Sequence, residues 1–182
     1  MVQQKKGSVN CIAILGLIPE YTNEVASLVA EQLDMYYLDT LKLFEFDYGA
    51  YTFSELIKLN KTKWVRQKLY KRIKFACSLT NTIITCEPKT IKSEQKMKHI
   101  CDNTLVIYLH QDERKVKKYE AEKEYKDNYL KKFFQIKDPD IKRMIYLAKN
   151  YADITINASK FSTFKCMGEV LREIKKYYGV EE

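Results

Sequence analysis

The chain has 182 residues, of which 46% are hydrophobic and 31% are charged, and this composition fits one globular domain spanning residues 1–182. It contains no run of about 18 apolar residues and no secretory signal pattern, so we expect a cytoplasmic protein with no membrane partner. The net charge of +8 favours anionic partners, and nucleic acids, nucleotides and acidic surfaces are all candidates.

Cysteine and histidine are too scattered to indicate a metal site. The five cysteines form no Cys-x-x-Cys pair, and the two histidines, His99 and His110, do not stand at ligand spacing from a cysteine. We therefore expect reduced, buried thiols and no metal site. The cysteines are Cys11, Cys77, Cys86, Cys101 and Cys166.

Short apolar runs of strand length recur along the chain with helical stretches between them, which is the pattern of repeated strand–helix–strand units. The expected strands are 11–15, 35–38, 82–85, 105–109 and 153–156. The connecting segments carry apolar residues at helical spacing, such as Val65, Leu69 and Ile73. We predict a three-layer α/β fold, in which a five-stranded parallel sheet carries helices on both faces.

Residues 111–137 interrupt this pattern, because charged residues and tyrosines dominate and apolar positions are sparse before Leu130, Phe133 and Phe134. Two interpretations of this segment remain open. It is a solvated surface helix, or it is a lid over a ligand site. In both cases the segment is an excursion from the core of the domain.

The order of several segments resembles that of shikimate kinase. The pieces are a strand ending at Gly16, a loop over 16–23, a helix over 24–33, a strand ending at Asp39, the strands 82–85 and 105–109, and a closing Ala-Asp-strand-helix from Ala152. The resemblance covers most of the chain. It implies the fold of the small P-loop kinases and, if the protein is active, the use of ATP and magnesium.

The loop departs from the phosphate-binding pattern G-x-x-x-x-G-K-[ST], in which backbone N–H groups and a lysine hold the phosphates. Gly16 keeps the first position. The second glycine, the lysine and the Ser/Thr positions are occupied by Tyr21, Thr22 and Asn23. Pro19 lacks an N–H group and Glu20 adds a negative charge, so we expect no bound cofactor. The alternative for this segment is a simple strand-to-helix turn.

The resemblance implies two substrate-binding residues, Asp39 and Arg66. Asp39 matches the first acid of the family's Asp-x-Asp phrase, whose second acid is replaced by Leu41, and Arg66 matches the family's substrate-clamping arginine. Asp39 is also the one candidate remnant of the catalytic site, which is not intact. An aspartate at such a position equally favours a helix N-cap or a loop.

The segment 58–74 holds eight basic residues and no acidic one. In a helix its apolar stripe would face the core and leave the cations in solvent. Lysines beside the aromatic Trp64 and Tyr70 would suit nucleic acid, whereas the alternative is an ordinary solvated face. We predict an anion-binding surface composed of Lys61, Lys68, Lys71 and Arg72.

These observations favour a degenerate relative of shikimate kinase that has lost phosphoryl transfer and binds a partner protein or an anionic ligand. The first alternative is a divergent shikimate kinase or other ATP-dependent small-molecule kinase, with Asp39 near magnesium and Lys131 or Lys132 supplied from segment 111–137. The second alternative is a nucleic-acid-binding accessory protein that uses residues 58–74.

Overall fold

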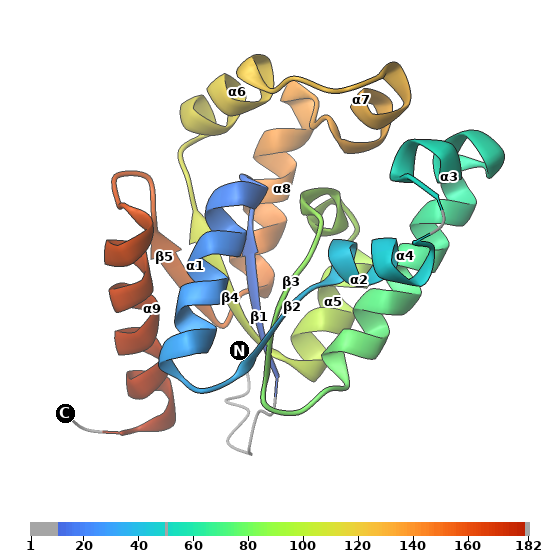
Figure 1. Ribbon diagram of the computed structural model, residues 1–182. Coiled ribbons are helices and arrows are strands. Elements are labelled where there is room, and N and C mark those ends of the chain that lie inside the picture. The colour runs from blue at the N-terminus through green and yellow to red at the C-terminus, as the bar shows by residue number, and fades with distance from the viewer. Residues whose placement is uncertain (1–10, 50, 181–182) are drawn as a thin grey trace.

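The computed structural model describes residues 11–49 and 51–180 (Figure 1). The first ten and last two residues, which the sequence analysis assigned to the single domain, lie outside the described residues, as does residue 50.

Five parallel strands form one sheet in the order β2-β3-β1-β4-β5. The strands are β1 (Cys11–Gly16), β2 (Tyr36–Asp39), β3 (Thr82–Thr85), β4 (Leu105–His110) and β5 (Ile154–Asn157). Each lies within one residue of its predicted range, so the predicted parallel sheet is confirmed. Because β1 lies between β3 and β4, the strand order reverses there. In open α/β sheets ligands bind outside the carboxyl ends of the strands at such a point.

Helices cover both faces of the sheet (Figure 1). Successive side chains of a strand point to opposite faces, and Ile12 and Ile14 of β1 accordingly pack against a different set of helices from Ala13 and Leu15. The first set comprises α1 (Pro19–Gln32) and α9 (Thr163–Tyr178), and the second comprises α4 (Thr62–Cys77), α5 (Glu94–Asn103) and α8 (Asp138–Tyr151). The predicted three-layer α/β architecture is confirmed.

A separate buried cluster, which we call the aromatic cluster, lies beside the main core. Phe44, Phe53 and Phe133 are its aromatic centre, and their side chains come from three different helices. The elements outside the three layers are α2 (Thr40–Asp47), α3 (Phe53–Leu59), the 3-10 helix η1 (Pro88–Lys92), α6 (Glu113–Glu122) and α7 (Asn128–Phe134).

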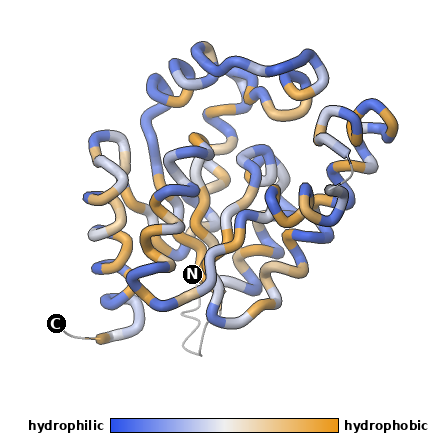
Figure 2. The backbone as a smooth tube through the Cα atoms, in the orientation of Figure 1, coloured by the Kyte–Doolittle hydropathy of each residue, from blue (hydrophilic) through white to orange (hydrophobic). Residues whose placement is uncertain are grey.

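Segment 111–137 folds as the two helices α6 and α7 rather than as one solvated helix (Figure 1). Figure 2 shows that it is mostly hydrophilic, in contrast to the hydrophobic strands beneath it. Its attachment is nevertheless apolar, because Val116 of α6 joins the main core and Phe133 of α7 joins the aromatic cluster, both fully buried. The segment is therefore packed against two parts of the domain.

None of the helices in the described part of the chain is long and apolar enough to cross a membrane. Among the same residues there is no group of three or more side chains that could hold a metal ion. Cys11, Cys77 and Cys166 are buried as expected, whereas Cys86 and Cys101 are partly exposed. Burial raises the pKa of Cys11 and Cys77 to about 12, so these thiols stay protonated at neutral pH.

Candidate functional site

The turn after β1 is short and buried. Only Leu17 and Ile18 separate the end of β1 from Pro19, the first residue of α1. The amide N–H of Thr22 donates to the carbonyl oxygen of Ile18 at 3.0 Å, which closes the first turn of the helix. The loop expected over 16–23 is thus replaced by a two-residue turn and the start of α1.

The side chain of Thr22 fills the space next to Gly16. Its hydroxyl donates to the carbonyl oxygen of Ile18 at 2.9 Å, and Thr22 is only 3% exposed. A Cβ atom placed on Gly16 would collide with this hydroxyl. The glycine therefore permits the close packing of strand against helix, which is a sufficient structural reason for its presence.

The carboxylate of Glu20 joins the first turn of α1 to segment 111–137. It accepts a hydrogen bond from the hydroxyl of Tyr119 in α6. Lys123, which follows α6, donates to that same hydroxyl at 2.7 Å and lies 3.8 Å from the carboxylate. The amino-terminal end of α1, which is the positive end of its dipole, therefore already lies next to the Glu20 carboxylate, and that carboxylate is paired with Lys123.

Asp39 is the N-cap of α2. One carboxylate oxygen accepts from the backbone N–H of Leu41 at 2.8 Å, and the other accepts from the side-chain amide of Asn23 at 3.0 Å. Burial raises the pKa of this carboxyl group, and the hydrogen bond from Leu41 partly offsets that effect. The structure thus brings together two predicted site residues, Asp39 and Asn23. It gives Asp39 the capping contacts that the sequence left as an alternative.

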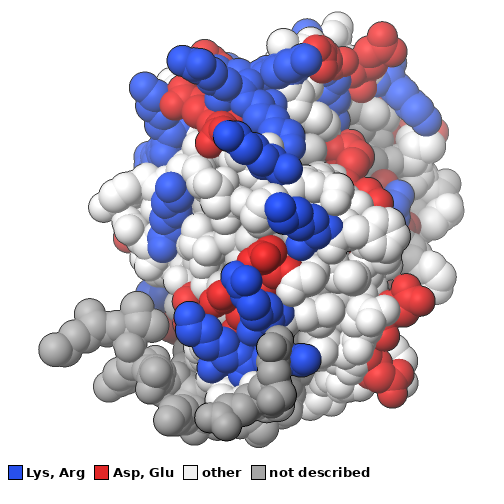
Figure 3. Space-filling model, turned by 90° about the vertical axis from the view of Figure 1, so that its left-hand side faces the viewer, with Lys and Arg blue, Asp and Glu red and all other residues white. Residues whose placement is uncertain are grey.

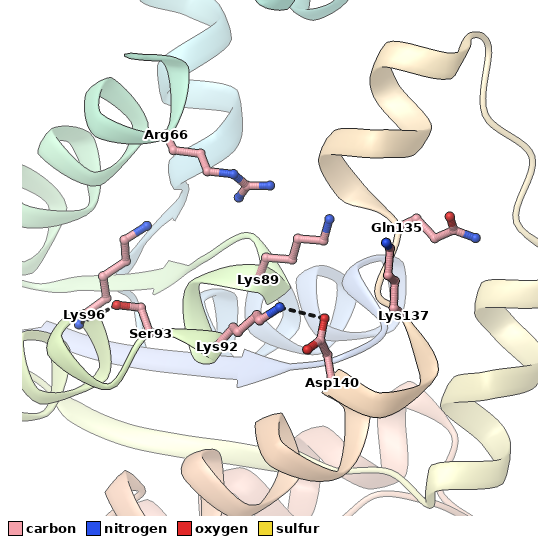
Figure 4. A pocket seen from close by; sticks show the side chains of 8 residues that line it. All are labelled: Arg66, Lys89, Lys92, Ser93, Lys96, Gln135, Lys137 and Asp140. Atoms are coloured by element: carbon pink, nitrogen blue, oxygen red, sulfur yellow. Dashed lines mark hydrogen bonds and ion pairs between the residues drawn. The ribbon is translucent and has the colours of Figure 1, made fainter. Parts of the chain in front are cut away.

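A basic pocket of about 400 Å³ lies beside the carboxyl end of β3. Figure 4 shows cationic side chains around it, from α4 on one side, from η1 between, and from the approach to α8 on the other. Its described lining consists of Arg66, Lys89, Lys92, Ser93, Lys96, Gln135, Lys137 and Asp140. We call this site the basic pocket.

Few carboxylates balance the charge of the basic pocket. Asp140 pairs with Lys92 at 2.7 Å. Glu87 is only 4% exposed. Burial raises the pKa of its carboxyl group, and the nearby charges of Arg66 and Lys89 only partly offset that effect. One of its oxygens has no hydrogen-bond partner among the described residues. Burial and the neighbouring Arg66 lower the pKa of Lys89, and burial lowers that of Lys96.

Arg66, the predicted substrate residue, lies in the basic pocket and also contacts α7. Its guanidinium group lies 4.2 Å from the centre of the Phe133 ring and donates to the Phe133 carbonyl oxygen at 2.8 Å. The ammonium group of Lys89 donates to the same carbonyl at 2.7 Å. The carboxyl-terminal end of α7 is therefore held over the pocket by two of its cations.

The predicted anion-binding surface is less uniform than a single basic helix. The segment 58–74 spans the end of α3 and most of α4, so Lys58 lies on a different helix from the rest. Lys61 and Lys71 are exposed, but Arg72 pairs with Asp47 of α2, and Lys68 lies over the ring of Trp64 at 5.4 Å. Trp64 itself packs against the aromatic cluster.

Positive charge also gathers on other parts of the surface. Figure 3 shows Lys and Arg side chains at the top of another face of the molecule, where α6 lies, with acidic side chains between them. Lys131 and Lys132, which the kinase alternative would need as active-site lysines, are exposed on α7.

The sequence analysis missed the lysines that dominate the basic pocket. Lys89 and Lys92 lie in η1 and Lys96 lies in α5, just after β3. The sequence did contain a signal for these lysines, because all three follow a buried parallel strand within a dozen residues. Ligand sites of α/β proteins lie at such strand ends. Lys137 carries no comparable signal, since only the fold brings it to the pocket.

Similar folds occur among solved structures. Shikimate kinase from Aquifex aeolicus matches with a TM-score of 0.73 at 13% identity, covering 94% of this chain and 99% of that chain. Shikimate kinase from Acinetobacter baumannii, in complex with shikimate, matches with a TM-score of 0.70 at 15% identity, covering 93% and 94%. The YorR protein from Bacillus subtilis, in complex with phosphorylated GDP, matches with a TM-score of 0.55 at 16% identity, covering 94% and 99%. At these identities the matches show a shared fold.

Sequence comparison agrees with the structural matches. No individual curated protein matches the chain significantly. The family model for shikimate kinase matches residues 23–175, which leaves the turn between Gly16 and Thr22 outside the match. Because the matched range covers most of the chain, the match establishes which family the chain belongs to. The chain belongs to the shikimate kinase family.

Proposed function

We propose that this family member binds a small anionic ligand in the basic pocket and does not transfer phosphate from ATP. The observation that carries the proposal is the contrast between two neighbouring sites. The turn after β1 is filled by Thr22 and the first turn of α1. The basic pocket is open, and five of its eight described lining residues are cationic.

The residues of the turn do not fit the phosphates of ATP. A phosphate loop needs successive backbone N–H groups that point into an open concavity. Here Pro19 has no N–H, Thr22 already donates within the helix, and the Ile18 N-cap has no side-chain oxygen or nitrogen. Glu20 adds a carboxylate, which would repel a phosphate charge at 4 Å by about 1 kcal/mol in water, and its ion pair with Lys123 reduces that repulsion.

The magnesium position is also altered. The family pattern places a hydroxyl on the metal, whereas Asn23 donates its amide to Asp39 at 3.0 Å. Asp39 uses its remaining oxygen for the N-cap of α2. A divalent cation at Asp39 would have to share these oxygens with the two hydrogen bonds, and we derive no catalytic step through ATP or magnesium.

The pocket supports an anionic ligand by its unbalanced charge. Two of its lysines, Lys89 and Lys96, have lowered pKa values because they are buried near other cations. A bound anion would offset that cost and stabilise their charged forms. Among the described residues no carboxylate forms an ion pair with Lys89, Lys96 or Lys137.

A thermal-shift titration tests the proposal. Inorganic phosphate and small carboxylates should stabilise the protein, by about 2.7 kcal/mol at 100 times the dissociation constant. The shift should be lost in Lys89→Gln and retained in Lys98→Gln, which changes an exposed lysine of α5. ATP is itself a polyanion, so any shift that it causes should disappear in Lys89→Gln as well.

A turnover assay separates the proposal from the kinase alternative. With ATP, magnesium and shikimate we expect no phosphate transfer. Turnover of about 1–100 per second, the usual range of intact kinases, would show that the altered turn is compensated and that this protein is a divergent kinase. The nucleic-acid alternative predicts instead that oligonucleotides bind through residues 58–74, which share only Arg66 with the described lining of the basic pocket.

A further inference from the structure

A second cavity lies at the amino ends of the strands, at the opposite end of the sheet from the basic pocket. The carboxyl-terminal ends of α1 and α9 meet there beside the turn that leads into β3, away from segment 111–137 (Figure 1). Its volume is about 460 Å³, which is within the range of about 300–1,000 Å³ for small-molecule sites. We call this cavity the apolar pocket.

The lining of the apolar pocket is mostly aliphatic. Ile12 of β1 and Ile174 of α9 are almost fully buried, and Leu33 and Met35 pack against the same core cluster. Tyr178 is the one aromatic residue in the described lining. An aliphatic chain matches such walls better than an aromatic ring does, because rings gain most from packing against other rings.

The rim of the apolar pocket between β2 and β3 is held by two residues in the left-handed backbone region. Asp34 has a φ of 52° and Asn81 has a φ of 51°, a conformation that aspartate and asparagine adopt more readily than most residues. The side-chain amide of Asn81 donates to the Asp34 carbonyl oxygen at 3.2 Å, and the Asn81 carbonyl oxygen accepts from the N–H of Tyr36 at 2.9 Å. These contacts join the two turns, so this side of the pocket is formed before any ligand binds.

Lys175 is the one charged residue in the described lining of the apolar pocket. Nearby ion pairs join Arg172 and Lys176 to Glu173, and no carboxylate of the described residues forms an ion pair with Lys175. The carbonyl oxygen of Lys175 accepts from the N–H of Val180 at 3.0 Å, so the end of the helix is capped without the ammonium group. That ammonium group is therefore available to an anion of one charge.

We propose that the apolar pocket binds an aliphatic monocarboxylic acid, whose chain lies against Ile12, Leu33 and Ile174 and whose carboxylate pairs with Lys175. A phosphate monoester carries about −1.5 to −2 charges at neutral pH, and it would need more than one cation. This site is independent of the proposed function, because the apolar pocket shares no described lining residue with the basic pocket.

Calorimetric titration of matched probes tests the assignment. Octanoate and butanoate have the same carboxylate and differ by four methylene groups, each of which contributes up to about fourfold in affinity when it is fully buried. We expect octanoate to bind at least tenfold more tightly than butanoate. Octylamine has a chain of similar length with a positive charge, which Lys175 repels, so it should bind at least tenfold more weakly than octanoate.

The methyl group of Met35 reports where the probe binds. In protein labelled with carbon-13 at the methionine methyl groups, octanoate should shift the NMR signal of Met35. The signals of Met97 and Met144 should not move, because both residues are fully buried on the other face of the sheet. Shifts of Met97 or Met144 without a shift of Met35 would place the probe elsewhere and overturn the assignment.

Two substitutions of exposed residues test the carboxylate contact. In Lys175→Gln octanoate should bind more weakly by about fivefold, the effect of losing an opposite charge at 4 Å in water, whereas octylamine should bind no more weakly. Val180→Asp adds a negative charge at a lining residue that is 58% exposed, and it should weaken octanoate by a similar factor. The control is Lys176→Gln, whose charge already pairs with Glu173, and it should change the octanoate affinity by less than twofold.

The outcomes that would overturn this site differ from those for the basic pocket. Equal affinities for octanoate and octylamine, or for octanoate and butanoate, would show that the carboxylate or the chain is not recognised. Loss of octanoate binding in Lys89→Gln rather than in Lys175→Gln would place the carboxylate in the basic pocket, which supports the proposed function and contradicts this site. If octanoate does not bind, or if sedimentation shows that it only displaces a second copy of the chain, the apolar pocket is not a site for a carboxylic acid.

Discussion

The hydroxyl of Thr22 determines how closely α1 can pack against β1. It lies where a Cβ of residue 16 would be, so Gly16→Ala should destabilise the protein by about 1–3 kcal/mol, the usual cost of overpacking a well-packed site. Chemical denaturation measures the change. A glycine retained for phosphate binding would instead give a variant of normal stability and altered nucleotide affinity.

The double variant provides the control for this prediction. Thr22→Ala removes the colliding hydroxyl, so adding Gly16→Ala in that background should cost much less than it does in the parent. The coupling free energy from the double-mutant cycle isolates the contact between the two residues. Additive effects of the two substitutions would contradict the packing explanation.

Glu87 should make stability depend on pH. Burial raises its pKa in the folded protein above the ordinary value of 4.5, so the folded state binds more protons than the unfolded chain in the range just above that value. Stability linked to Glu87 is then highest below that ordinary pKa and is lost as the pH rises through the folded pKa.

The matched variant for Glu87 is Glu87→Gln. Because glutamine does not titrate, the stability of this variant relative to the parent should increase from pH 4 towards pH 7. Urea denaturation over that range measures the difference. A difference that decreases with pH would show that Arg66, Lys89 and Lys96 stabilise the Glu87 carboxylate more strongly than burial opposes it.

At the scale of elements, Glu20 should hold segment 111–137 against α1. Glu20→Gln removes the ion pair with Lys123 and weakens the hydrogen bond from Tyr119. Exposed ion pairs contribute about 0.2–1 kcal/mol, so amide hydrogen exchange in α6 should become faster by up to about fivefold, with little change in global stability. Hydrogen exchange followed by mass spectrometry measures both.

The control for the segment is Lys118→Gln, whose partner Glu122 lies on the same helix. This variant should leave the exchange of α6 almost unchanged, since it breaks no contact with α1. Equal acceleration in both variants would mean that the stability of α6 itself, rather than its contact with Glu20, controls the exchange.

The strands could be predicted from the sequence because each parallel strand is a short apolar run between polar residues. Thr82–Thr85, for example, is buried throughout and was predicted without error. The beginning of α1 was placed too late, because the loop was identified by its resemblance to a phosphate-binding pattern. Pro19 is common in the first turn of helices, and that local signal indicated the true start.

The candidate site was harder to predict, because tertiary contacts determine which cations meet. Arg66 was identified through the resemblance, but its contact with Phe133 joins residues 67 positions apart. Lys137 reaches the basic pocket only because α8 packs beside η1 (Figure 1). Asp39, by contrast, was correctly recognised as a possible helix cap, since capping depends on neighbouring residues alone.

At the scale of the whole molecule, the net charge of +8 attracts polyanions without specifying a site. The structure divides this charge among the basic pocket, α4 and segment 111–137. A small ligand can use the pocket, whereas a nucleic acid needs an extended surface. The two modes of binding can therefore be separated by variants and by salt.

Oligonucleotide binding through residues 58–74 remains the prediction from the basic segment. Lys61, Lys68 and Lys71 are the cations to change, because Arg72 is needed by Asp47. The parent should bind single-stranded RNA with an affinity that falls steeply with salt. Replacing the three lysines with glutamine should reduce the slope of log affinity against log salt by about 2, since each phosphate contact contributes about 0.7.

Fluorescence anisotropy with labelled RNA at several salt concentrations measures these slopes. The charge-matched control replaces Arg114, Lys118 and Lys126 of segment 111–137, which are exposed, with glutamine. Neither triple variant should shift the thermal midpoint appreciably, because exposed charges contribute little to stability. If both variants reduce the slope equally, binding reflects net charge rather than a surface on α4. If the parent shows no salt-dependent binding, the cations of α4 form a solvated face.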